Sequence, residues 1–162
     1  MKTFRNVWIA FAAIALLVGS AYADTVPNGP QKAKTEKFVK NAICYIFKHG
    51  EQKAFKKFNQ RSSRFSQGDQ YLYVFVYKGP HKGEALAHPH NPEYIGSKKV
   101  EQYKDLSNQR VMNKIYTLVQ NNGGWMKIDY QRPSTKKVED KYIYVLPVPG
   151  TDYFIGSGFH PN

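Results

Sequence analysis

Residues 71–79 read YLYVFVYKG, a run of β-branched and aromatic residues that a glycine ends. This composition is typical of a β-strand. Side chains alternate along a strand, so the run has two chemically different faces. One face is aliphatic and carries Leu72, Val74 and Val76. The other is aromatic with hydroxyl tips and carries Tyr71, Tyr73, Phe75 and Tyr77. We expect the aliphatic face to pack against a helix and the aromatic face to be available for a ligand.

Helical patterns precede this strand, and further strand patterns follow it. Apolar residues at helical spacing fill residues 34–50, and a shorter helix is expected over 51–58. Downstream we expect one helix over 109–121 and four more strands, at 84–88, 125–131, 141–148 and 152–159. Short connections indicate antiparallel pairing. The predicted class is α+β, with an antiparallel sheet of about five strands and a long N-terminal helix packed on one face.

The beginning of the chain has the pattern of a targeting signal. Two basic residues precede an apolar run at 7–19, and the small-residue motif AYA follows at 21–23. A membrane anchor would need an apolar span of roughly 20 residues, and this run is shorter. We therefore expect a signal peptide over residues 1–23 and a single domain over residues 24–162, located in the periplasm or secreted.

Size and charge limit the classes of partner. Without residues 1–23 the chain has 139 residues, enough for one core, with 22 Lys and Arg against 12 Asp and Glu, a net charge of +10. Such a charge attracts anions in general. Because the basic residues are spread along the whole chain, we do not expect a nucleic-acid partner. The only cysteine, Cys44, lies among apolar residues and is expected to be buried.

Tyrosines are unusually frequent on the predicted strands. Tyr142 and Tyr144 share one face of their strand, opposite Lys141, and three more tyrosines project from residues 71–79. Each buried hydroxyl needs a hydrogen-bond partner, which a small polar ligand or water would supply. The alternative is that these hydroxyls reach the surface. The residue pattern alone leaves both interpretations open.

Short motifs in a fixed order link the chain to a known family. They are Tyr73-Val74-Phe75-Val76-Tyr77, Gly83, Ala87-His88-Pro89, Ile95-Gly96, Asp105, Gly124-Trp125, Tyr130, Lys141-Tyr142-Ile143-Tyr144-Val145, Pro149-Gly150-Thr151-Asp152 and Ile155-Gly156-Ser157-Gly158. From about residue 39 to residue 159, this order resembles the single Cache domain, type 2, an extracytoplasmic sensing module of bacterial chemoreceptors and sensor kinases.

The resemblance implies a PAS-like antiparallel sheet, with the N-terminal helix on one face and a pocket for a small molecule, often a short carboxylate, on the other. It implies ligand-binding roles for Tyr73, Phe75, His88, Trp125, Tyr130, Lys141 and Tyr144. An ammonium, an imidazole and tyrosine hydroxyls are suitable partners for a carboxylate. Lys141 and Tyr144 alternate to opposite faces, so both can line the pocket only if the strand is bulged or twisted near Lys141.

Two features depart from the family pattern. The hairpin end at residues 78–83 is basic, and the sequence stops at residue 162 with no transmembrane helix or signalling domain after it. The hypothesis is therefore a soluble exported protein that binds a small metabolite, expected to be a short-chain organic acid, and passes the signal to a membrane receptor or sensor kinase. The alternative is a basic interaction protein with a vestigial pocket that docks an acidic partner or a membrane surface.

An enzyme is the third class, and the sequence does not favour it. It holds no plausible grouping of a nucleophile with a histidine and a carboxylate, and no H-E-x-x-H motif. A metal site built from His81, His88 and His90 competes with the pocket, but side chains at i and i+2 of an extended chain point to opposite sides. We expect no catalytic residues, no metal and no cofactor.

Overall fold

The computed structural model describes residues 28–161. The predicted signal peptide lies outside these residues. Within them, no helix is both long enough and apolar enough to cross a membrane.

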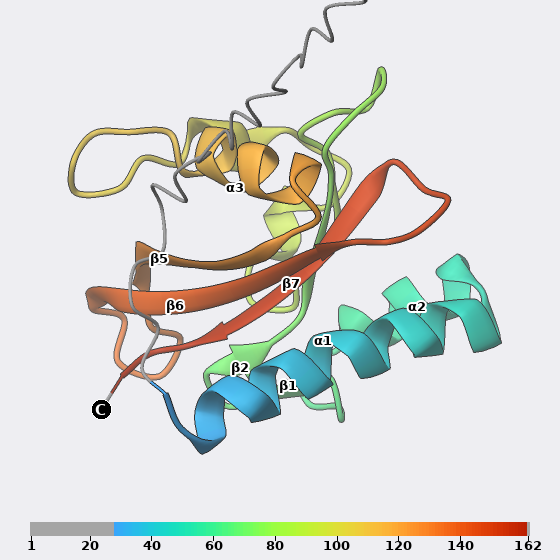
Figure 1. The fold of residues 1–162 in the computed structure, drawn as a ribbon, viewed down its shortest axis with the longest axis horizontal. Coiled ribbons are helices and arrows are strands. Elements are labelled where there is room, and N and C mark those ends of the chain that lie inside the picture. The colour runs from blue at the N-terminus through green and yellow to red at the C-terminus, as the bar shows by residue number, and fades with distance from the viewer. Residues whose placement is uncertain (1–27, 162) are drawn as a thin grey trace, which may run out of the picture.

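A five-stranded antiparallel sheet forms the centre of the molecule (Figure 1). Its strands are β3 (Tyr73–Val76), β4 (Ala85–Ala87), β5 (Gly124–Gln131), β6 (Val138–Pro147) and β7 (Tyr153–Phe159). Their order is β4-β3-β7-β6-β5, so the last strand of the chain lies in the middle of the sheet. The predicted α+β class and the five-stranded sheet are confirmed.

Two consecutive helices cover one face of the sheet (Figure 1). Helix α1 (Pro30–His49) begins with a proline in its first turn, and the chain passes through Gly50 into α2 (Glu51–Phe58). Gly50 has φ 79°, a conformation that glycine adopts without strain. The inward residues of the helices pack on the aliphatic side of β3, in a cluster that includes Val39, Ala42, Ile46, Phe58, Leu72, Val74 and Val76. The predicted role of this face is confirmed.

The opposite face is covered by the segment between β4 and β5. This segment contains two short 3-10 helices, η1 (Pro92–Tyr94) and η2 (Lys99–Gln102), and the helix α3 (Val111–Gln120). The aromatic side of β3 belongs to a second apolar cluster, together with the inward side of α3. The sheet is therefore enclosed on both faces.

Two sequence-based predictions differ from the structure. The strand expected over 71–79 is divided into β2 (Gln70–Tyr71), which pairs with β1 (Ser66–Gln67), and β3, and the chain leaves the sheet after Val76. The prediction that Cys44 is buried is wrong, because its side chain is exposed. Cys44 lies between Ala42 and Ile46 in sequence, but two positions along a helix correspond to more than half a turn, so it faces solvent while they face the sheet.

Candidate ligand-binding site

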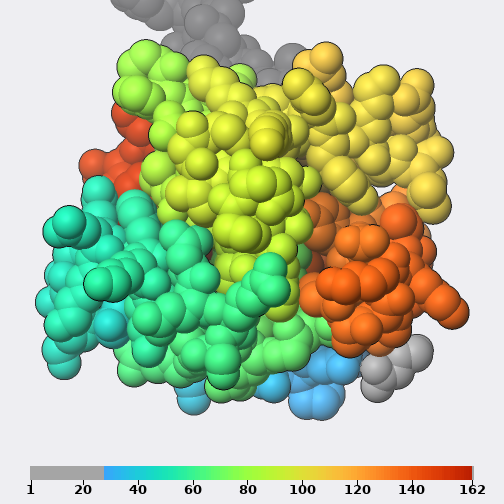
Figure 2. Space-filling model, turned by 180° about the vertical axis from the view of Figure 1, so that it is seen from behind, coloured from blue at the N-terminus to red at the C-terminus, as the bar shows by residue number. Residues whose placement is uncertain are grey.

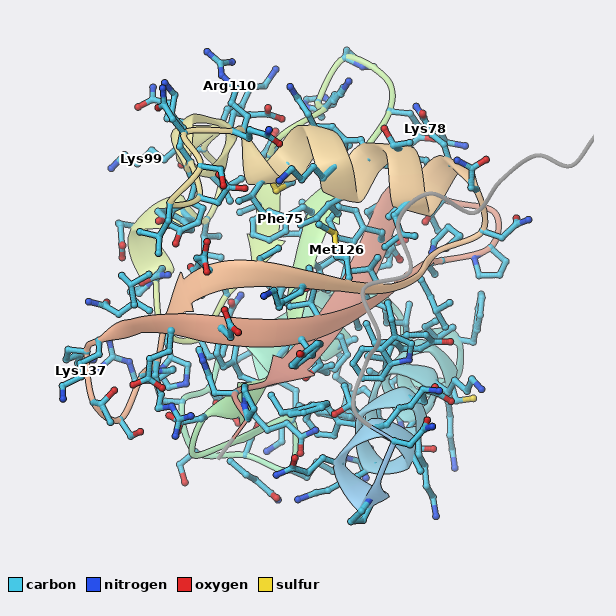
Figure 3. All side chains as sticks on the ribbon, turned by 60° about the vertical axis from the view of Figure 1, so that its left-hand side comes forward. Phe75, Lys78, Lys99, Arg110, Met126 and Lys137 are labelled. Carbon is cyan, nitrogen blue, oxygen red and sulfur yellow. The ribbon has the colours of Figure 1, made fainter. Side chains whose placement is uncertain are left out.

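A small cavity lies between the aromatic face of the sheet and α3. Its volume is about 40 Å³. A single buried water needs roughly 10–15 Å³ on the same measure, so the cavity has room for a few water-sized groups. The five-stranded sheet supplies Tyr73, Phe75, Ile128, Tyr130, Lys141 and Ile143, and the segment above it supplies Val100, Tyr103, Val111, Met112 and Ile115. Tyr71 comes from β2, and His88 follows the last residue of β4. Figure 3 shows Phe75 and Met126 pointing into the space between the sheet and α3.

Lys141 is the most unusual side chain of this lining. It pairs with Ile128 in an unbroken β5–β6 register, and only 2% of its surface is exposed. Its Nζ donates to the Tyr71 hydroxyl at 3.0 Å and lies 4.2 Å from the centroid of the Tyr71 ring. No ion pair joins it to a carboxylate among residues 28–161. Burial lowers the pKa of Lys141 to about 7, and the more distant charge of Asp69 opposes this shift.

Tyr73 brings an unsatisfied hydroxyl to the same cavity. Its oxygen is buried and has no hydrogen-bond partner in the described structure. Burial raises the pKa of Tyr73 above its usual value, so this group is a neutral donor. The ring lies against Gly156 of β7, where an added Cβ would be 2.5 Å from two ring carbons. Gly156 therefore leaves room for the Tyr73 ring. The buried Tyr73 hydroxyl lacks an acceptor, which a ligand in the cavity would supply.

His88 and Tyr130 are joined by Asn91. The main-chain N–H of Asn91 donates to His88 Nδ1 at 3.1 Å, which assigns the ring proton to Nε2. The Asn91 side-chain amide donates to the Tyr130 hydroxyl at 3.0 Å, and this hydroxyl keeps its own proton to donate elsewhere. Burial lowers the pKa of His88 to about 3, followed by the effects of Lys141 and His90, so the imidazole is neutral.

The lining divides into a polar part and an apolar part. Polar groups come from the strands, through Lys141, Tyr71, Tyr73 and Tyr130, and from His88 just after β4. The side chains from α3 are aliphatic or thioether groups. The segment before α3 closes the cavity from above, and its Tyr103 hydroxyl donates to the main-chain oxygen of Asp129 at 2.7 Å. This segment, yellow-green to yellow in Figure 2, forms the middle of the surface on that side. A ligand would therefore be enclosed and contacted by donors at one end only.

Five of the seven residues implied by the family resemblance line this cavity. They are Tyr73, Phe75, His88, Tyr130 and Lys141. Trp125 and Tyr144 do not line it. They pair across β5 and β6 on the α1 side of the sheet, where Trp125 Nε1 donates to Glu36 of α1 at 2.9 Å. The physical reason is the regular alternation of β6, which has no bulge near Lys141.

Sequence reasoning missed several residues of the site. Tyr71 was assigned to the correct face by alternation, but its contact with Lys141 was not predicted. Asn91, which no sequence pattern singled out, is half-buried between His88 and Tyr130. The apolar lining from α3 was readable only as a helical face, because periodicity does not say which cavity a helix covers.

The histidines are not gathered into a metal site. His81 lies on the exposed hairpin beyond β3, where its Nδ1 is 3.0 Å from the Glu84 carboxylate, whereas His88 is buried in the cavity wall. Within the described part of the chain, no group of three or more His, Cys, Asp or Glu side chains is arranged to hold a metal ion.

The comparison with protein families agrees with this architecture. The single Cache domain 2 model matches residues 49–161, which is more than half of the chain. The chain belongs to the single Cache domain 2 family. Cache domains are extracytoplasmic sensory modules. No curated protein matches the sequence.

Solved structures share the fold of this Cache domain at low sequence identity. A methyl-accepting chemotaxis protein from Vibrio parahaemolyticus has a TM-score of 0.62 at 15% identity, over 80% of this chain and 87% of the other. A Cache chemosensory domain, solved in work on carboxylic acid recognition, has a TM-score of 0.64 at 20% identity, over 81% and 93%. A periplasmic sensor domain of a chemotaxis protein has a TM-score of 0.58 at 15% identity, over 80% and 90%.

Proposed function

We propose that this Cache domain is a sensor that binds a short-chain carboxylate in the cavity beneath α3. The observation that carries the proposal is the ammonium of Lys141, which is buried and has no ion-pair partner in the described residues. A buried charge is costly unless it is paired and hydrogen-bonded. An anion in the cavity would pair it.

The donors around the cavity suit a carboxylate. Lys141 would supply the charge, and the hydroxyls of Tyr73 and Tyr130 together with the Nε2–H of His88 would supply neutral hydrogen bonds. Phe75 would form part of the apolar wall. A carboxylate has about four acceptor positions, so three or four convergent donors satisfy it without a second cation.

The shape of the cavity favours a small monocarboxylate. A volume of about 40 Å³ is well below the roughly 300–1,000 Å³ of ordinary ligand pockets, so an acid of two or three carbons is the best fit. The lining beneath α3 is apolar and would meet the tail. A second carboxylate or an ammonium on the ligand would have no partner there, so we expect dicarboxylates and amino acids to bind weakly.

The structural likeness supports the same class of ligand and suggests who receives the signal. One of the similar domains was solved in a study of carboxylic acid recognition, and others come from chemotaxis proteins. We therefore also propose that the domain is exported and that its ligand-bound form binds a separate membrane receptor or sensor kinase. Crosslinking to such a partner with and without ligand would test this part.

Calorimetry and thermal unfolding test the ligand directly. Acetate and propionate should bind and raise the melting temperature, because a ligand at a hundred times its dissociation constant adds roughly 2.7 kcal/mol of stability. Acetamide has the size of acetate but no charge and should have no effect. Succinate should bind more weakly than propionate.

A pair of lysine variants supplies the matched control. Lys141→Met keeps the length of the side chain and removes the ammonium, so the response to acetate and propionate should be lost. Lys137→Met removes an exposed ammonium at the far end of the β5–β6 hairpin and should leave the response intact. The proposal fails if no short carboxylate stabilises the protein, or if the two variants respond equally.

A further inference from the structure

The positive charge of the domain is concentrated in its first helical layer. Residues 30–64, which comprise α1, α2 and the turn after them, contain ten Lys and Arg and only two Glu, a net charge of +8. Residues 65–161 contain twelve Lys and Arg against nine Asp and Glu, a net charge of +3. The basic residues are spread along the sequence, but the acidic residues are not, so the charge is segregated in space. We call residues 30–64 the basic layer.

The two carboxylates of the basic layer are used elsewhere. Glu36 accepts the hydrogen bond of Trp125 Nε1 on β5, and Glu51 accepts that of the Tyr153 hydroxyl on β7 at 2.9 Å. No ion pair within residues 28–161 involves a Lys or Arg of this layer. The field of the layer is therefore not neutralised by the protein itself.

The cations project from the solvent side of the helices. Six lysines of the layer are exposed, namely Lys34, Lys37, Lys40, Lys48, Lys53 and Lys56. Lys37, Lys40 and Phe47 share one stripe of α1 because they recur at helical spacing, and Phe47 is 62% exposed. Desolvation lowers the pKa of His49, and the charges of Lys53, Lys48 and Arg64 lower it further, which reflects the crowding of cations at this end.

We propose that the basic layer docks this domain on an anionic phospholipid membrane. Eight of its ten cations are lysines, which are depleted in protein–protein interfaces, where arginine is enriched. Compact, hydrated ammonium groups on flexible stems suit a plane of phosphate headgroups. Clusters of 4–8 basic residues bind such surfaces at about 1 kcal/mol for each side chain. The exposed ring of Phe47 among these lysines would reach the headgroup boundary.

Docking by this layer leaves the ligand cavity free. The basic layer lies on one face of the sheet, and α3 with the segment that covers the cavity lies on the other (Figure 1). The domain would therefore lie with α1 and α2 toward the lipid and the cavity away from it. The docking proposal does not depend on which ligand the cavity binds.

Vesicle co-sedimentation tests the proposal. Purified protein should sediment with vesicles of phosphatidylcholine mixed with phosphatidylglycerol and not with vesicles of phosphatidylcholine alone. Added sodium chloride should release it, because the interaction is between exposed charges. The triple variant Lys34→Glu, Lys37→Glu, Lys40→Glu should lower the apparent partition coefficient by about 100-fold, from three side chains at about 1 kcal/mol each.

A second triple variant has the same change in net charge at another place. Lys99→Glu, Arg110→Glu and Lys137→Glu alter three exposed cations that Figure 3 shows projecting away from the α1–α2 layer, and this variant should bind the mixed vesicles nearly as well as the wild type. Circular dichroism checks that both variants fold. The proposal is overturned if the wild type does not bind the mixed vesicles, or if both variants lose binding equally. It is also overturned if soluble polyglutamate binds more tightly than the vesicles, which would indicate an acidic protein partner.

Discussion

The two faces of this sheet are built from similar aromatic and aliphatic residues, yet they differ in their buried polar groups. The α1 face contains Phe58, Leu72 and Val74 with no exposed surface, and it packs as an ordinary core. The α3 face contains a buried ammonium, a neutral imidazole and an unpaired phenol around a cavity. One strand, β3, supplies both faces. The difference shows that a buried ammonium without an ion pair, rather than aromatic content, distinguishes the candidate site from the core among the described residues.

The largest expected effect on stability comes from a substitution in the core beneath α1 and α2. Phe58→Ala removes a side chain with no exposed surface that contacts the rings of Tyr45, Phe55 and Phe65. We expect the free energy of unfolding to fall by about 3–5 kcal/mol, measured by urea denaturation. The protein that remains folded should bind its ligand with unchanged affinity, because the cavity is on the other face.

The exposed ring of Phe47 is the control for this change. Phe47→Ala should alter the free energy of unfolding by no more than about 0.5 kcal/mol. If Phe58→Ala also weakened ligand binding in folded protein, the two faces would be coupled and the comparison between them would not hold.

Removing the buried charge of Lys141 should raise the free energy of unfolding rather than lower it. Lys141→Met replaces an unpaired ammonium by an apolar group of similar length, so the ligand-free protein should become more stable near neutral pH by about 1–4 kcal/mol. In the folded protein the pKa of Lys141 is about 7, below the unfolded value of about 10.4. The unfolded chain therefore binds more protons between these values. The penalty is fully present below about pH 7 and is lost as the pH rises toward the unfolded pKa.

Urea denaturation at neutral pH and about two pH units higher measures this. The difference in stability between Lys141→Met and the wild type should shrink as the pH rises, and taking the difference cancels the titration of the tyrosines. If the difference in stability between the two proteins did not change with pH, Lys141 would not be desolvated. The α3 face would then not contain the buried charge that distinguishes it from the α1 face.

Carboxylate binding should also take up protons. An anion beside Lys141 favours the charged amine, so above about pH 7 the ligand should enter together with up to one proton. The affinity should then fall by as much as about tenfold for each pH unit above the pKa of the empty site. Calorimetry in two buffers with different ionisation enthalpies gives the number of protons directly. Binding heats that are independent of the buffer would contradict the prediction.

The architecture could be predicted from local patterns. The alternation in residues 71–79 assigned Leu72 and Val74 to a helix-covered face and Tyr73 and Phe75 to the other, and both clusters follow that assignment. It succeeded because a strand with two dissimilar sets of side chains has only one register that buries both correctly. Alternation also predicts the face of Lys141 correctly, although the residue is charged, because β6 keeps a regular register there.

The site could be predicted only in part. The family resemblance implied Trp125 and Tyr144 together with Lys141, although alternation already placed Tyr144 and Lys141 on opposite faces. Asn91 could not be found, because the segment after His88 has no periodicity, and its contacts come from the way that segment folds back over the sheet. Whether the five cavity residues bind a ligand stays a prediction.

The smallest expected effect comes from a single hydroxyl on the α3 face. Tyr73→Phe removes a buried oxygen that has no partner in the described structure, so the ligand-free protein should gain about 1 kcal/mol in stability. If that hydroxyl donates to the carboxylate, the affinity for acetate or propionate should fall by about 10- to 100-fold, because a hydrogen bond to a charged group is worth about 1.5–3 kcal/mol.

Tyr144→Phe is the matched change on the α1 face, where the ring packs on Trp125 and is half-buried. It should leave the affinity unchanged and the stability within about 0.5 kcal/mol. If both variants lose affinity, hydroxyl groups on both faces affect binding. If neither variant loses affinity, the Tyr73 hydroxyl does not bind the ligand. The separation of a core face from a binding face is supported only if Tyr73→Phe lowers the affinity and Tyr144→Phe does not, because the two substitutions remove the same atom from the two sides of one sheet.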